Sequence, residues 1–248
     1  MWSEDARLEW RTESRGVSFD TSAYLRRATG RAKSDVANKL VSMFLHGVSR
    51  RLTAYLGLAV TDAAYTTAVA EIFGSSCAYC GRSFEDDRVA VEHLDGMNRF
   101  RVGLHIPGNV VLACRPCNSE KRRHDSLKQL VLAETGWESF LWHADSKCGI
   151  GCKTCDYWRS LWPAEGERRK RLLGVHARIS GFRAKYPRSL EVSKEARTQL
   201  RPLLDRLYRD CQKFAADTIE GAVDDAVRRL QEGSALVVPV TGPRYAGA

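Results

Sequence analysis

The 248-residue sequence has no run of about 18 apolar residues, the length that a transmembrane helix needs. Its first 30 residues carry acids and arginines but no apolar stretch, so we expect no secretory signal peptide. There is no internal repeat and no low-complexity segment, and proline and glycine stand at ordinary levels. These absences exclude a transmembrane helix and an architecture of internal repeats. The composition, 44% hydrophobic and 28% charged, is that of a globular protein, which we expect in the cytoplasm.

The eight cysteines are grouped rather than scattered. Disulfides are rare in a reducing compartment, and cysteines two or three residues apart suit a metal better than a bridge. Two CxxC pairs therefore predict a closed, tetrahedral structural zinc site of four thiolates. Its ligands would be Cys77, Cys80, Cys114 and Cys117. Such a zinc would contribute folding energy to a segment with little apolar core.

A third group of cysteines follows His143 in the chain and consists of Cys148, Cys152 and Cys155. Three thiolates and one imidazole would complete a second tetrahedral zinc site. The imidazole position stays open, because His176 or the isolated Cys211 could take the place of His143. The tryptophans near this group are expected to form its small core rather than to stack on bases; they are Trp137, Trp142, Trp158 and Trp162.

The middle of the chain is expected to hold two short strands followed by a helix. Residues 89–91 and 110–112 are strand-like, and a helix should begin near Pro116, which suits a first helical turn. The apolar spacing elsewhere favours helices, and the expected segments are 62–73, 126–142, 164–184 and 193–231.

Between the two CxxC pairs lie residues of the kind that a hydrolytic site needs. Glu92 and His93 end the first strand-like segment, and Asn109 opens the second. Asn118 directly follows the last cysteine, and Lys121 stands three residues further on. This order and spacing resemble the HNH family of nucleases, also called ββα-metal or His-Me finger nucleases. The resemblance implies an α+β fold, mainly α, in which helical regions flank a zinc-stapled ββα-metal module.

The resemblance also implies a role for each position. His93 would be the general base that takes a proton from the attacking water, and Asn109 would orient its imidazole. Glu92 and Asn118 would hold one catalytic divalent cation, expected to be Mg²⁺ with Mn²⁺ as a substitute. The chemistry agrees, because imidazole titrates near neutrality and a hard cation prefers oxygen ligands. Since neighbours on a strand point to opposite faces, Glu92 and His93 can flank one phosphate only where the strand bends or ends.

Basic side chains are expected to contact the phosphates of nucleic acid. Residues 161–213 hold 14 basic and 6 acidic side chains, and such a surplus suits a polyanion. The candidates for DNA contact are Arg99, Arg101, Lys121, Arg122, Arg168 and Arg169. His105, beside a Pro-Gly turn, is either a second base or phosphate ligand or, as we favour, a structural residue.

From the resemblance we expect a metal-dependent endonuclease that hydrolyses double-stranded DNA, most simply a type II-like restriction enzyme. A homodimer would cut both strands of a palindrome, and a cognate methyltransferase is expected on another chain. The alternatives are a homing or phage-type enzyme, a modification-dependent enzyme, an RNA-processing nuclease, and a non-catalytic zinc-stapled DNA-binding protein. The expected regions are 1–76 (helical, for dimerisation or DNA contact), 77–125 (nuclease module), 126–160 (helix and second knuckle) and 161–248 (basic and helical).

Overall fold

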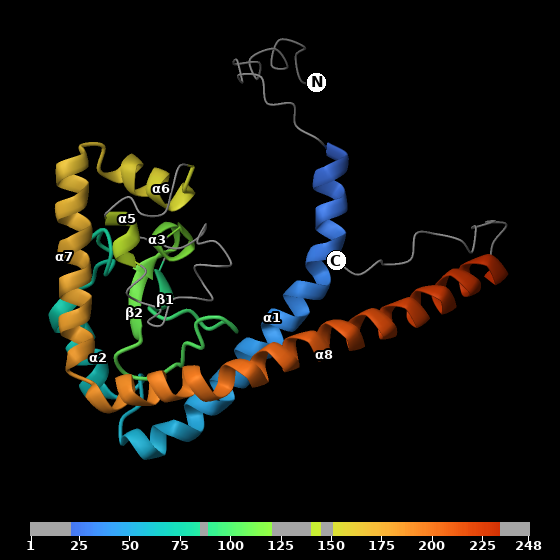
Figure 1. Cartoon of the computed structure of the whole chain (residues 1–248), viewed down its shortest axis with the longest axis horizontal. Coiled ribbons are helices and arrows are strands. Elements are labelled where there is room, and N and C mark those ends of the chain that lie inside the picture. Colours follow the sequence, from blue (N-terminus) through green and yellow to red (C-terminus); the bar gives the residue numbers. More distant parts are fainter. Residues whose placement is uncertain (1–20, 85–88, 121–139, 145–150, 234–248) are drawn as a thin grey trace, which may run out of the picture.

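The computed structural model describes residues 21–84, 89–120, 140–144 and 151–233. The described part is mainly helical, as predicted, with a single antiparallel strand pair (Figure 1). In chain order its elements are α1 (Thr21–Leu56), α2 (Ala63–Phe73), β1 (Val89–His93), β2 (Val110–Cys114), α3 (Arg115–Glu120), α5 (Leu141–Ala144), α6 (Lys153–Leu161), α7 (Glu165–Ala184) and α8 (Pro187–Gly233). Among the described helices, none combines the length and apolar character that crossing a membrane requires.

The strand pair leads directly into a helix and forms a ββα unit. β1 and β2 pair with Val89 opposite Cys114 and with His93 opposite Val110. Both predicted strands are confirmed, and each continues two residues beyond its predicted end. Four of the five residues of β2 are buried, because helices from both flanks of the chain pack around it. The main core around β2 includes Tyr65 and Phe73 from α2, Trp158 from α6, and Leu172, Val175, Ile179 and Phe182 from α7.

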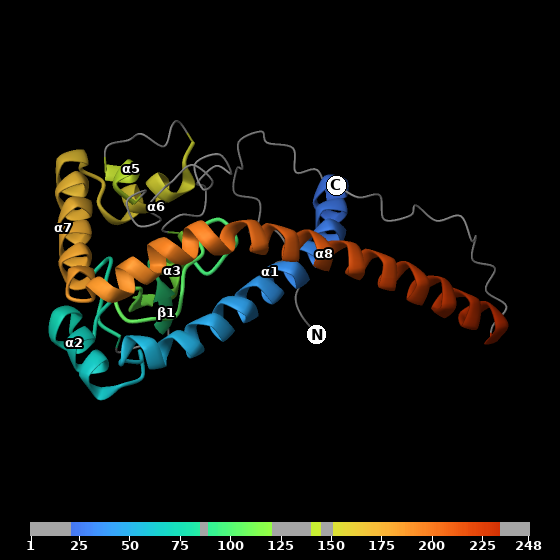
Figure 2. The ribbon, with the colours of Figure 1, turned by 60° about the horizontal axis from the view of Figure 1, so that its bottom comes forward.

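A second apolar cluster lies where α1 crosses α8 (Figures 1 and 2). The long connection from β1 to β2, residues 94–109, packs against this crossing. The members of the cluster are Val41 and Leu45 from α1, Leu204 from α8, and Val102, Leu104 and Ile106 from the connection. The two terminal regions therefore hold the loop that follows His93.

Of the four helices predicted by range, two are confirmed, one begins earlier than predicted, and one falls mostly outside the described residues. The helices predicted at 62–73 and 164–184 are confirmed as α2 and α7. The start predicted for the last helix at residue 193 is wrong, because α8 begins at Pro187, a residue suited to a first turn. Pro202 lies inside α8 without ending it, next to Leu204, which is buried against α1. The predicted helix at 126–142 falls mostly outside the described residues.

Candidate functional site

The two CxxC pairs meet in space as the sequence predicted. Cys77 and Cys80 lie on a tight turn that Gly81 closes with φ 73°, its amide donating to the carbonyl of Cys77 at 2.9 Å. Cys114 ends β2, and Cys117 lies in the first turn of α3. The four Sγ atoms lie within 4.8 Å of one another, and Cys80 Sγ is 3.8 Å from Cys114 Sγ. Thiolates bound at about 2.3 Å to a tetrahedral zinc stand about 3.8 Å apart, so this donor set fits the ion.

The thiols share hydrogen bonds that already favour deprotonation of one of them. Hydrogen bonds with Cys117 and Cys80 lower the pKa of Cys77 to about 2. The same pairing with Cys77 raises the pKa of Cys117. A bound zinc would take all four as thiolates.

Two tyrosines connect this cysteine cluster to its surroundings. Tyr157 on α6 places its hydroxyl 3.0 Å from Cys117 Sγ. Burial, reinforced by this contact, raises the pKa of Tyr157, so its hydroxyl stays protonated and can donate to Cys117 when a bound zinc holds that sulfur as a thiolate. Tyr79, inside the first CxxC pair, donates to Glu92 Oε1 at 3.0 Å. Neither tyrosine could be assigned a role from the sequence, because each contact depends on the tertiary fold.

Glu92 and His93 face different neighbours at the end of β1. Glu92 is 1% exposed and lies against Tyr79 of the cysteine turn. His93 is half-buried and contacts His105 instead. β1 ends at His93, which meets the condition for two adjacent strand residues to flank one phosphate. α3, which carries half-buried Asn118, packs against β1, and a carboxylate with an amide oxygen suits a hard divalent cation.

Three histidines gather around the position expected for the general base. His93 Nε2 lies 2.9 Å from His105 Nδ1, and the ring of exposed His46 on α1 lies 5.3 Å from that of His105 and 6.1 Å from that of His93. Burial, assisted by the neighbouring imidazoles, lowers the pKa of His93 to about 3. His93 is therefore neutral at physiological pH. No local sequence signal marked His46, which stands far upstream in a helix of ordinary apolar spacing.

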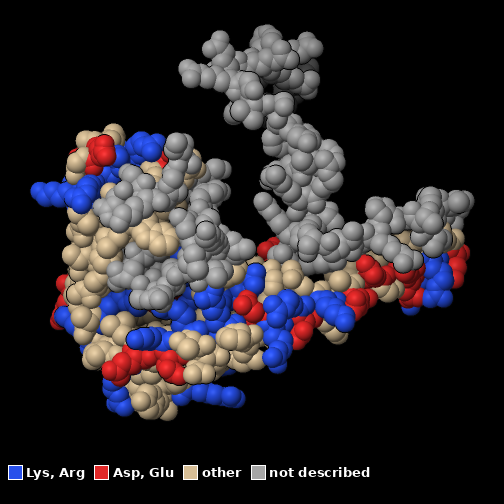
Figure 3. Space-filling model, in the orientation of Figure 1, with Lys and Arg blue, Asp and Glu red and all other residues tan. Residues whose placement is uncertain are grey.

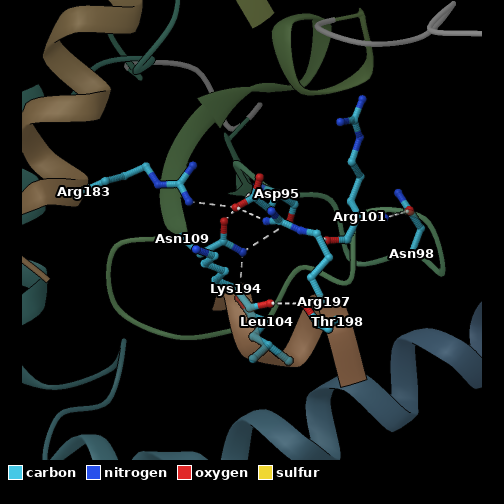
Figure 4. Close-up of polar contacts among 9 residues, drawn as sticks. All are labelled: Asp95, Asn98, Arg101, Leu104, Asn109, Arg183, Lys194, Arg197 and Thr198. Atoms are coloured by element: carbon cyan, nitrogen blue, oxygen red, sulfur yellow. Dashed lines mark hydrogen bonds and ion pairs between the residues drawn. The ribbon is translucent and has the colours of Figure 1, made fainter. Parts of the chain in front are cut away.

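Asn109 ties together the two ends of the loop that follows His93 (Figure 4). Its Oδ1 accepts from the Asp95 amide at 2.8 Å, and its Nδ2 donates to the carbonyls of Leu104 at 2.8 Å and Asp95 at 3.2 Å. The side chain is 2% exposed. This geometry supports the expected role of Asn109, because the loop it closes begins at the residue after His93.

The same loop is anchored by buried charge and by close backbone packing. Asp95, 1% exposed, pairs with Arg183 of α7 at 2.8 Å and with Arg197 of α8 at 3.5 Å (Figure 4). Val102 adopts φ 51°, a strained value for a β-branched residue. A Cβ on Gly103 would stand 1.7 Å from the carbonyl oxygen of Asp95, so only glycine fits there. The loop is thus held rigidly from three sides.

The arginines expected to contact DNA have different surroundings. Arg101 is 1% exposed in this structure, and its expected contact with DNA stays a prediction. Arg99 pairs with Asp205 at 2.7 Å, and Arg168 donates to the carbonyls of Trp162 and Pro163 after α6. Arg169 is exposed on α7, and Figure 3 shows further Lys and Arg side chains gathered across the middle of the molecule. Lys121 and Arg122 lie outside the described residues.

The second cysteine group is also brought together. His143 of α5 lies within 4.8 Å of both Cys152 and Cys155, measured between their ligand atoms. Three residues were considered for this ligand position. Among the described residues, the group that could hold a metal contains His143, and it contains neither His176 nor Cys211. Cys148 lies outside the described residues.

Residues 77–124 match the sequence profile of a known family, described as HNH endonuclease. The match spans both CxxC pairs and all four positions to which the resemblance assigned catalytic roles. No curated protein and no solved structure matches the chain.

Proposed function

Because the chain carries an HNH endonuclease domain, of a family that uses divalent metals and acts on DNA, we propose that it is a site-specific DNA endonuclease of the type II restriction class. The observation that carries the catalytic part is the placement of His93. His93 ends β1, next to Glu92 on the same strand, and α3, which carries Asn118, packs against that strand. Glu92 and Asn118 would supply oxygen donors, and Asn109 closes the loop that follows His93.

His93 acts as the general base in this proposal. Its imidazole is neutral at physiological pH and can accept the proton of an attacking water. The negative charge of a phosphate beside it favours the protonated form, and this raises its pKa toward neutrality when DNA is bound. Asn109 and the buried Asp95–Arg183 pair keep the loop, and with it the imidazole, in one position.

Glu92 and Asn118 would hold the catalytic cation, which we take to be Mg²⁺. When bound, such a cation neutralises the charge that develops on the leaving 3′ oxygen. Tyr79 fixes one carboxylate oxygen of Glu92 by its hydrogen bond, so the zinc knuckle sets the orientation of this ligand.

Site specificity and dimerisation are proposed from the helices around the module. The far half of α8 extends beyond the body of the molecule (Figure 1) and leaves apolar side chains exposed, among them Phe214 at 71% and Leu230 at 57%. A two-fold dimer through such a helix would present two catalytic modules to the two strands of a palindrome. Exposed Arg169 on α7 would add contacts to the phosphate backbone.

The test is a digest of long genomic DNA with the purified protein, with Mg²⁺ and with a chelator. Discrete metal-dependent bands support the proposal, and sequencing of the ends gives the site. A featureless smear would retain the nuclease and remove the site specificity. Cutting of modified DNA alone would indicate a modification-dependent enzyme, and preference for RNA in a parallel digest would overturn the DNA assignment. Binding without any cleavage would leave a zinc-stapled DNA-binding protein.

A further inference from the structure

A second group of metal-type ligands lies on α5 and α6. His143 Nδ1 is 3.7 Å from Cys152 Sγ and 3.5 Å from Cys155 Sγ. A sulfur at about 2.3 Å and a nitrogen at about 2.1 Å from a tetrahedral zinc stand about 3.6 Å apart. The two measured separations fall on either side of this value, so the three side chains already have the spacing of ligands around one ion.

The local backbone presents these ligands together. Gly151, with φ 82°, makes the turn that leads into Cys152, the residue that caps the N-terminus of α6. Cys155 follows in the first turn of that helix. His143 approaches from α5 and is 3% exposed, while Cys152 is 6% exposed. Burial of this kind suits a structural ion rather than an open catalytic one.

We propose that His143, Cys152 and Cys155 bind a second structural zinc ion, distinct from the four-cysteine site. This zinc ties α5 to the start of α6. The short α5 has four residues, and a helix of that length has little stability of its own. A metal bond to His143 therefore supplies a constraint that helix propensity cannot.

The second zinc also stabilises α6, the helix that packs against the four-cysteine site. On α6, the Tyr157 hydroxyl lies 3.0 Å from Cys117 Sγ, and Trp158 is fully buried, packed against Tyr79 with ring centroids 6.2 Å apart. Trp158 also stacks on Trp162, with an interplanar angle of 7° and centroids 5.6 Å apart. Fixing the N-terminus of α6 thus fixes the residues that contact the first zinc site and the tyrosine that holds Glu92.

Zinc content of the purified full-length protein tests the proposal, without reference to DNA cleavage. The expected content is two zinc ions per chain, falling to one in Cys155→Ser and in His143→Ala. His143→Cys, which restores a ligand, is expected to return the content to two. Cys211→Ser, which changes the isolated cysteine on α8, is the matched control and should keep two. One zinc in the wild-type protein, or two in Cys155→Ser, would overturn the proposal.

A measurement on the wild-type protein alone covers the case in which the variants do not fold. X-ray absorption at the zinc edge should show a nitrogen from imidazole in the average coordination shell, because half of the ions would be bound to His143. A shell of sulfur alone contradicts the proposal, since it leaves only the four-cysteine site.

Discussion

Replacing Asn109 by alanine is expected to cost more stability than any other single asparagine-to-alanine change in the loop at 94–109. The side chain makes three buried hydrogen bonds that join the loop ends. Each contributes about 1 kcal/mol net, and leaving buried partners unsatisfied adds to this, so the expected loss is at least about 3 kcal/mol. Urea unfolding at saturating zinc measures the loss. Asn98→Ala is the control. Asn98 is half-buried and accepts two hydrogen bonds, from the amides of Phe100 and Arg101; at about 0.5 kcal/mol each, because water can replace them, they predict a loss of about 1 kcal/mol.

Asn109→Asp is a second test, because aspartate has nearly the shape of asparagine but carries a carboxylate oxygen in place of the donating NH₂ group. An aspartate can still accept from the Asp95 amide, but its other oxygen would face the carbonyls of Leu104 and Asp95. A buried carboxylate against two acceptors is unfavourable, so at pH 8 this variant should be no more stable than Asn109→Ala. Its deficit should shrink as the pH falls and the carboxyl becomes a donor. An Asn109→Asp variant as stable as wild type, or equal losses of stability for Asn98→Ala and Asn109→Ala, would show that the hydrogen bonds of Asn109 do not hold the loop together.

Three further predictions concern zinc, buried charge and acid stability. Tyr157→Phe removes the donor to Cys117 and should weaken zinc binding there about 10- to 100-fold in competition with a chelator. Arg183→Met leaves Asp95 buried without its closest partner and should cost about 3–5 kcal/mol in urea unfolding, unless Asp95 is replaced by Asn as well. Histidine in the unfolded chain takes up a proton below pH 6.5, whereas the pKa of His93 in the folded protein is about 3. Between pH 7 and pH 5 the free energy of unfolding of wild type should therefore fall by about 2 kcal/mol more than that of His93→Gln. Equal losses in the two proteins would contradict the low pKa of His93.

The sequence predicted the parts of the fold that depend on local pattern. The two strands, the helix after Cys114 and the convergence of the four cysteines follow from alternation, spacing and the geometry of a metal knuckle. The end of β1 at His93 was missed by two residues, because the apolar alternation stops at Val91 and polar residues begin at Glu92.

The rest of the site depends on contacts between distant segments. His46 reaches the histidine cluster only because α1 crosses α8 beside the loop, and no spacing in the sequence reports that crossing. Arg101, which the sequence placed on a polar loop expected to contact phosphates, is 1% exposed, and nothing in its local sequence marks it as a buried residue. Asp95 shows the reverse case: an acid in a polar stretch becomes the buried partner of Arg183, far away in the chain.

The cleavage rate of His93→Ala shows whether the module cleaves DNA with His93 as its general base. Single-turnover cleavage of DNA that contains the site, with Mg²⁺, is compared with wild type and with His176→Ala on α7, and DNA affinity is measured by gel shift. We predict a rate about 10²- to 10⁴-fold below wild type for His93→Ala, near-normal cleavage for His176→Ala, and similar DNA affinity for all three. Unchanged cleavage by His93→Ala with intact zinc content would rule out His93 as the general base.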